Sequence, residues 1–305
     1  MQKVKTFVRV TRAPFVTAVI VPALLGAMVA WQDGRFHLGY LLLTLLGIMC
    51  VNIGLNLSND YFDHLSGNDE SNQELTPFSG GSRTIQDGIL APRQVLTGSM
   101  LFFGLGALVG LYLAWARGWP LLLLGALGMF LAFFHNAPPV NLYRLVPGVG
   151  ELAAGIGCGP LVVLGSYFVQ AQRFSLGALW ASIPIGLLIS AVLYINEFPD
   201  CGADKAAGKK TLVVVLGRER AVWGYIALLV ATYLTIAVGV LVRTFPWTVL
   251  LGLLSSPFAY LAIRGALRDH DDTQKLIPTN ALTIQIHLLT GLLLCVGYAM
   301  APWVH

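Results

Sequence analysis

Charged side chains are scarce in this sequence. They make up 11% of its 305 residues, whereas soluble globular chains carry about 25%. This scarcity excludes an ordinary soluble domain, a disordered chain and a nucleic-acid-binding protein. Cysteine is also rare, with four residues and no Cys-x-x-Cys pair. The sequence therefore predicts neither a disulfide framework nor a zinc site.

Apolar residues, in contrast, make up 56% of the chain, and the mean hydropathy is +0.72. A helix of about 20 apolar residues crosses the hydrocarbon core of a bilayer. Stretches of this kind recur throughout, which predicts an all-α, polytopic transmembrane bundle of about nine helices, forming a single domain over residues 1–305. The expected spans are 13–31, 38–57, 95–116, 119–134, 147–169, 176–195, 221–242, 246–263 and 281–303.

The basic residues predict the orientation of these spans. With the N-terminus in the cytoplasm, fifteen of the nineteen Lys and Arg residues fall on the cytoplasmic side, as the positive-inside rule requires. Fourteen of the fifteen acidic residues fall on that side as well, with Asp33 outside. We therefore expect cytoplasmic active-site loops at about 58–94 and 196–220, in a protein integral to a bacterial cytoplasmic membrane.

Two columns of polar side chains mark the ends of the second and sixth spans. At 100° per residue, the members of each column project from one narrow helix face. Polar groups that face the membrane interior are functional by default, although helix-end residues can also simply meet water. The first column is Asn52, Asn56, Asp60 and Asp63, and the second is Asn196, Asp200 and Asp204.

The chemistry of the two columns favours a hard cation. Carboxylate and amide oxygens, without His or Cys, suit Mg²⁺, which often bridges to substrate phosphates. Basic residues follow each column, where they would stabilise a departing diphosphate or simply anchor the cytoplasmic side. Of these, Arg83 and Lys205 are the stronger candidates for diphosphate binding, ahead of Lys209 and Lys210.

These motifs resemble those of the UbiA-type intramembrane prenyltransferases, over essentially the whole chain. The first family motif, Asn-Asp-x-x-Asp, is matched by Asn59, Asp60 and Asp63. Many members carry a further Asp where this chain has Gly67, and Asp69 stands here instead. The second motif is a series of Asn or Asp at every fourth position, followed by Gly-Lys-x-Thr-Leu. It is matched by Asn196, Asp200, Asp204, Gly208, Lys209, Thr211 and Leu212.

Within the family, the stretch from Asn56 to Asp69 looks most like the 1,4-dihydroxy-2-naphthoate prenyltransferases of menaquinone synthesis. Glu197 departs from the pattern, because many members have a second Asn at that position, and so does the loop 80–84. These departures concern the acceptor rather than the reaction class. Other acceptors remain open: 4-hydroxybenzoate, homogentisate, haem, a chlorophyll precursor or a glyceryl phosphate.

The resemblance implies Mg²⁺-dependent transfer of a polyprenyl group from an allylic polyprenyl diphosphate to an aromatic acceptor. On the naphthoate, substitution would take place at the carboxylated carbon with loss of CO₂. The resemblance also implies two Mg²⁺ ions bound together with the diphosphate. The expected metal ligands are Asn56, Asp60, Asp63, Asn196, Asp200 and Asp204, and the expected diphosphate ligands are Arg83, Lys205 and Lys209.

Glu151, just inside the fifth span, could orient or deprotonate an acceptor hydroxyl. Alternatively, it is a helix-end carboxylate near a positive dipole. A different class, an ion-coupled transporter, also uses intramembrane acidic residues. A transporter would need polar groups on both sides, whereas here they gather on one side.

Overall fold

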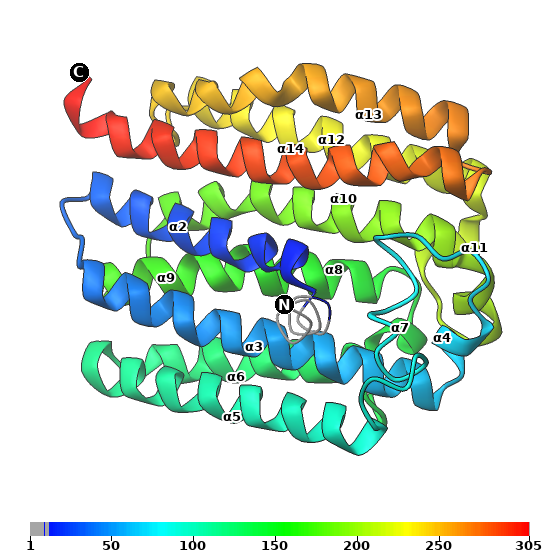
Figure 1. Cartoon of the computed structure of the whole chain (residues 1–305). Helices are drawn as coiled ribbons and strands as arrows, with labels where there is room; N and C mark the ends of the chain where they lie inside the picture. Colours follow the sequence, from blue (N-terminus) through cyan, green and yellow to red (C-terminus); the bar gives the residue numbers. More distant parts are fainter. Residues whose placement is uncertain (1–8, 10–11, 305) are drawn as a thin grey trace.

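The computed structural model describes residue 9 and residues 12–304, and it is built of helices that run back and forth between two ends (Figure 1). Within that part, seven helical segments are long and apolar enough to cross a membrane, and two shorter apolar helices, α2 and α6, accompany them. The predicted helical membrane bundle of about nine spans is therefore confirmed. The segments are α2 (Thr17–Gln32), α3 (Leu38–Leu65), α5 (Pro92–Arg117), α6 (Pro120–Phe134), α8 (Val149–Ile156) with η2 (Gly157–Leu161) and α9 (Val162–Ala171), α10 (Leu176–Ala206), α12 (Arg218–Leu241), η3 (Trp247–Ser255) with α13 (Ser256–Asp269), and α14 (Thr273–Met300).

Two of the helices are longer than the predicted spans. α3 continues to Leu65 and α10 to Ala206, past the expected ends at residues 57 and 195. Hydropathy falls where the polar columns begin, but the helical backbone continues through them. The first parts of the predicted loops 58–94 and 196–220 are therefore helix, and this keeps each column on one face.

Both of these helices run toward the end of the bundle that carries the short helices α4, α7 and α11 (Figure 1). We call this the polar end. η1 contacts α3 closer to the middle of the bundle, whereas η4 lies at the end opposite the polar end (Figure 1). The short helices are η1 (Ala13–Val16), α4 (Asn68–Ser71), α7 (Leu142–Leu145), α11 (Leu212–Leu216) and η4 (Ala301–Trp303).

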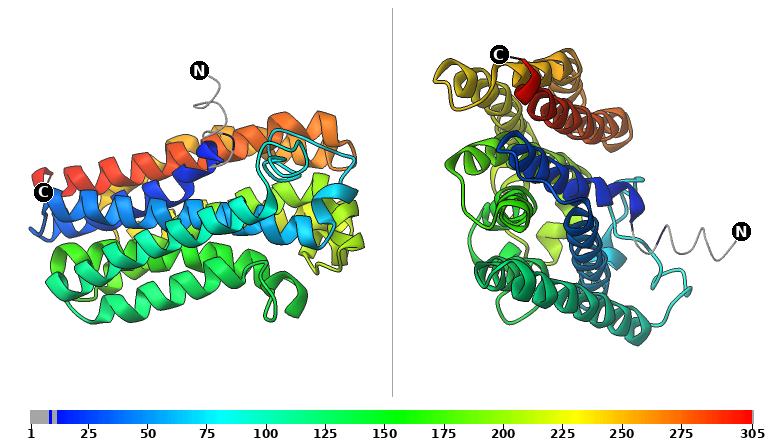
Figure 2. Two further views of the ribbon diagram at one scale, coloured as in Figure 1. Left: turned by 60° about the horizontal axis from the view of Figure 1, so that its bottom comes forward. Right: turned by 90° about the vertical axis from the view of Figure 1, so that its left-hand side faces the viewer.

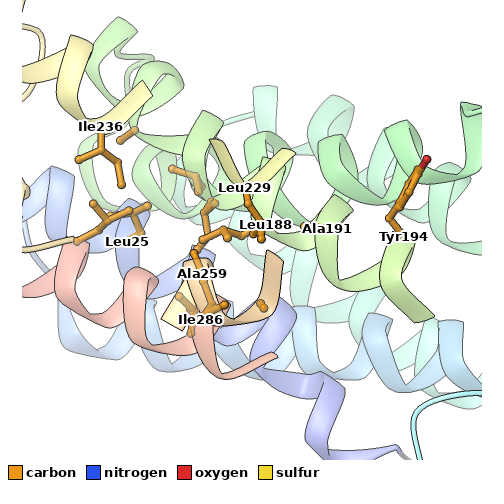
Figure 3. Close-up of a cluster of buried hydrophobic side chains, with 14 of the residues drawn as sticks. Leu25, Leu188, Ala191, Tyr194, Leu229, Ile236, Ala259 and Ile286 are labelled. Carbon is orange, nitrogen blue, oxygen red and sulfur yellow. The ribbon is translucent and has the colours of Figure 1, made fainter. Parts of the chain in front are cut away.

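The main hydrophobic core lies between α2, α9, α10 and the three C-terminal spans. Leu25 of α2, Leu188 of α10 and Leu229 of α12 meet in this core (Figure 3). Glycine allows the closest approaches: a Cβ on Gly159 would lie 2.6 Å from the Cα of Gly186. The η2 turn therefore packs directly on α10, and this fixes the helix that carries the second column.

α3, α5 and α6 form the opposite side of the bundle (Figure 2). α3 packs on α5 through a smaller cluster that includes Ile53, Leu57 and Val95. A cavity of about 690 Å³ separates this side from α2, α9 and α10. α6 has no buried side chain, because it borders the cavity and otherwise faces outward.

Candidate active site

The two polar columns meet at the polar end of the cavity, where Lys209 lies between them. Its Nζ is 3.0 Å from Oδ1 of Asp63 and 3.3 Å from Oδ1 of Asp204. Burial would lower the pKa of Lys209, but the two carboxylates outweigh burial and raise it. A buried, permanently charged ammonium thus joins the end of α3 to the end of α10.

A second basic residue, Arg12, neutralises negative charge in the first column. Its guanidinium donates to Oδ1 of Asp60, which also accepts the backbone N–H of Ser82 at 3.2 Å. Burial would lower the pKa of Arg12, but Asp60 and Asp69 outweigh burial and raise it. Arg12 lines the cavity, whereas Asp60 lies behind it. Sequence reasoning missed Arg12, because it is one of several basic residues near the N-terminus.

The second column is held by amides from distant parts of the chain. Asn72 Nδ2 donates to Oδ1 of Asp200 at 2.6 Å. Asn280 Nδ2 donates to Oδ1 of Asn196 at 2.7 Å and to the carbonyl of Ile195 at 3.0 Å. That carbonyl lacks its helical partner because Pro199, four residues on, has no N–H. α14 therefore supplies the bond that the proline removes.

Asp69, on the short helix α4, adds a further carboxylate to the site. Gly67 turns the chain with φ +72°, and Asp69 then reaches the cavity while remaining 2% exposed. A Cβ on Gly81 would lie 2.4 Å from Oδ2 of Asp69, so the glycine lets the loop pass over this carboxylate. Burial, followed by repulsion from Asp63, raises the pKa of Asp69 to about 7.

Aromatic and imidazole groups border Lys209. Its Nζ is 5.3 Å from the ring centroid of Tyr143, which packs edge-on against the ring of His135 at 4.5 Å. Burial, together with Lys209, lowers the pKa of His135 to about 4, so this imidazole is neutral. Asn136 follows and donates to Oδ2 of Asp63 at 3.1 Å.

Besides Asp60, three of the predicted site residues lie outside the cavity lining. Arg83 Nη1 donates to the backbone carbonyl of Asp69 at 2.6 Å and so braces α4. Lys205 is exposed on the last turn of α10. Glu151 is buried, and its Oε1 accepts the N–H of Leu212 at 2.7 Å, at the start of α11. The diphosphate role of the first two, and the acid–base role of the third, stay predictions.

The site has the composition expected for a hard divalent cation. Buried oxygens of Asp60 and Asp69 have no hydrogen-bond donor in the described part of the chain. Among residues 9 and 12–304, no three carboxylate, imidazole or thiol side chains converge to hold an ion by themselves. Amides such as Asn56 and Asn196, and phosphate oxygens, would complete the shell, as is usual for Mg²⁺.

Beyond this polar end, the cavity continues as an apolar channel between helices. Its walls are aliphatic side chains and glycines of α3, α5, α6, η2 and α9, such as Val51, Gly110, Leu124 and Leu161. One cavity thus joins a site for a charged group to a site for a hydrocarbon chain.

Such a cavity suits an amphipathic molecule, with a charged group at the polar end and a hydrocarbon chain in the channel. Residues 19–289 match the model of the UbiA prenyltransferase family. Because this match covers most of the sequence, the chain belongs to that family and is a prenyltransferase integral to a membrane.

Named relatives agree with the family assignment. The chain is 30% identical to a 2-carboxy-1,4-naphthoquinone phytyltransferase of Synechocystis sp., over 97% of this chain and 94% of that protein. It is 34% identical to a 1,4-dihydroxy-2-naphthoate octaprenyltransferase of Mycobacterium tuberculosis, over 87% and 84% of the two chains. A UbiA homologue from Archaeoglobus fulgidus, solved with GPP and Mg²⁺, has the same fold, with a TM-score of 0.60 and 15% identity over 94% of this chain and 99% of that one.

Proposed function

We propose that this enzyme transfers a polyprenyl group from its allylic diphosphate to 1,4-dihydroxy-2-naphthoate, a step of menaquinone synthesis. The C–O bond to diphosphate breaks, and a C–C bond forms at the carboxylated ring carbon. CO₂ then leaves that carbon and returns its electron pair to the ring. The observation that carries the proposal is the single cavity with a charged end and an apolar channel, together with the naphthoate relatives.

The residues of the two columns would hold Mg²⁺, which would neutralise the charge that develops on the departing diphosphate. The expected ligands are Asn56, Asp60, Asp63, Asn196, Asp200 and Asp204, with two ions as the working hypothesis. Lys209 supplies a buried positive charge between the columns, and Arg12 a second one next to Asp60. These cations favour the diphosphate in its leaving position.

We also propose that the polar end faces the cytoplasm of a bacterial cell, with the N-terminus on the same side. The distribution of Lys and Arg supports this orientation, with fifteen of nineteen residues on that side. The transporter alternative receives no support from the cavity. Its charged lining residues gather at the polar end, and the rest of its wall is almost entirely apolar.

The decisive experiment uses the detergent-solubilised protein with Mg²⁺, octaprenyl diphosphate, and either 1,4-dihydroxy-2-naphthoate or 4-hydroxybenzoate. Mass spectrometry should detect a prenylated, decarboxylated naphthoquinol from the first acceptor, and no product when EDTA is present. Product from 4-hydroxybenzoate instead would move the enzyme to another pathway. A folded sample that yields no adduct from either acceptor would refute the proposal.

A further inference from the structure

Glu197 is the acidic residue of the cavity that neither column explains. It is 4% exposed and lines the cavity, yet no group among residues 9 and 12–304 donates a hydrogen bond to either of its carboxyl oxygens. Its carboxyl group instead lies against that of Glu151, another acid. A buried acid next to another acid costs stability rather than providing it. Such a group inside a membrane protein therefore calls for a ligand.

The position of Glu197 identifies the part of the substrate that it faces. On α10 it follows Asn196 and lies seven residues before Asp204. Glu197 is therefore about 10 Å farther from the polar end than Asp204, measured along the helix. The lining residues one turn deeper are Val192 and Leu193. Glu197 thus lies at the junction between the polar end and the apolar channel. The carbon that joins a diphosphate to its hydrocarbon tail must lie at the same junction.

The charge of Glu197 then limits which group it can bind. A carboxyl group repels the diphosphate and the carboxylate of a naphthoate, and it offers nothing to a hydrocarbon chain. It can accept a hydrogen bond from a hydroxyl group, which both protonation states allow. Tyr143 and Lys209 line the same part of the cavity and offer an aromatic face and a positive charge. Together they match a planar phenol that also carries a carboxylate.

We infer that Glu197 determines acceptor specificity by accepting a hydrogen bond from a ring hydroxyl of the aromatic acceptor. This inference rests on the proposed function and deepens it. A site built to pair with a substrate hydroxyl discriminates strongly against analogues that lack it, because its own polar group is then left unpaired.

The test compares Glu197→Ala and Glu197→Gln with the wild-type protein. Glu197→Ala should raise the KM for 1,4-dihydroxy-2-naphthoate at least tenfold and leave the KM for octaprenyl diphosphate within twofold. Glu197→Gln keeps a carbonyl acceptor and should recover part of the loss. Neither variant removes a bond that stabilises the fold, so the melting temperature of Glu197→Gln should not fall. Glu219→Gln, on the exposed start of α12, is the matched control.

A second measurement tests whether Glu197 binds a particular ring hydroxyl of the acceptor. Equilibrium binding of 1,4-dihydroxy-2-naphthoate is compared with that of 1-hydroxy-2-naphthoate and 4-hydroxy-2-naphthoate. Loss of the paired hydroxyl should weaken binding to the wild type at least fivefold and binding to Glu197→Ala less than twofold. Equal losses in both proteins would overturn the inference, and so would a raised Mg²⁺ requirement in Glu197→Ala, since that would make Glu197 a metal ligand. Binding without prenylation in the wild type would contradict the proposed function alone.

Discussion

Lys209 and Asp63 form the contact that holds the two halves of the site together. The Nζ–Oδ1 distance is 3.0 Å, and both side chains are largely buried, at 8% and 13% exposure. The same Nζ reaches Asp204, so a single residue after α10 binds the ends of two helices that are distant in the sequence. The charge of Lys209 therefore joins the two columns directly.

Replacing Lys209 with Met should leave the carboxylates of Asp63 and Asp204 without the positive charge that pairs with them. Breaking a buried ion pair costs about 3–5 kcal/mol, so the melting temperature should fall and activity should be lost. Added Mg²⁺ should raise the melting temperature of Lys209→Met more than that of the wild type, because the ion replaces the missing charge. Lys275→Met removes an exposed lysine and is the control. Equal Mg²⁺ effects in both proteins would show that the ion does not bind at these carboxylates.

Asn280 should stabilise the fold because it replaces the helical hydrogen bond that Pro199 cannot donate to the Ile195 carbonyl. Asn280→Ala leaves the Ile195 carbonyl and Asn196 without a donor, which should cost about 1–3 kcal/mol and raise the half-saturating Mg²⁺ concentration severalfold. In a Pro199→Ala background the helix pairs that carbonyl itself, so Asn280→Ala should cost less. Chemical denaturation of the four proteins in a double-mutant cycle measures the difference. A cycle without coupling would mean that Asn280 does not compensate for the proline.

Glu151 can be tested for a positioning role against an acid–base role. Glu151→Gln still offers an oxygen to the N–H of Leu212, so activity within threefold of the wild type is expected. Glu151→Ala leaves that N–H unpaired and should cost about 1–3 kcal/mol. Thermal unfolding and kcat together separate the roles. A hundredfold loss of kcat in a stable Glu151→Gln would instead identify Glu151 as the general base.

Glu74 fastens the loop after α4 to α12 and α14, since it accepts from Arg218 at 2.7 Å and from Thr273. Burial would raise the pKa of Glu74, but these two hydrogen bonds outweigh it and lower the pKa. The bonds therefore add stability above pH 4.5, and this stability is lost as the pH falls through the lowered value. Because Glu74 is 49% exposed, the gain is under about 1 kcal/mol.

Hydrogen exchange checks this loop contact. In Glu74→Gln, amides of residues 72–82 should exchange faster at pH 7, and the difference from the wild type should shrink toward pH 4. Glu219→Gln, one residue after Arg218, should exchange like the wild type. Unchanged exchange in Glu74→Gln would show that other contacts hold the loop.

Gly110 offers a test of the apolar channel. It lines the cavity near the end of α5 that is far from the acidic residues, and an added Cβ would meet no atom within 4 Å. Gly110→Leu should lower kcat/KM at least tenfold for octaprenyl diphosphate and less than twofold for geranyl diphosphate. Gly104→Leu makes the same change on an exposed part of α5 and should alter neither. Equal losses for both substrates would place the tail elsewhere.

The parts of the site that follow a helix repeat could be predicted, and the parts that depend on chain crossings could not. The columns through Asp63 and Asp204 are predicted from a spacing of about four residues, and most of their members line the cavity, but Asp60, at the edge of the first column's arc, lies behind it. Asn280 lies in an apolar span, and no local pattern connects it to the carbonyl that Pro199 leaves free. Glu151 is a candidate base from the sequence, but Glu197 lines the cavity and Glu151 does not. This difference depends on how α8 packs against α10, which no sequence pattern shows.

The last carboxylate of each column, Asp63 or Asp204, also lies in the last turn of its helix, since α3 ends at Leu65 and α10 at Ala206. The carbonyl ends of two helix dipoles therefore point at the same place and add about half a negative charge each to that of the carboxylates. This field attracts a divalent cation, and it opposes the attraction of Lys209 and Arg12 for a diphosphate that arrives without metal. We therefore expect the metal to bind before the diphosphate or together with it, so that a low metal concentration slows substrate binding before any chemistry takes place.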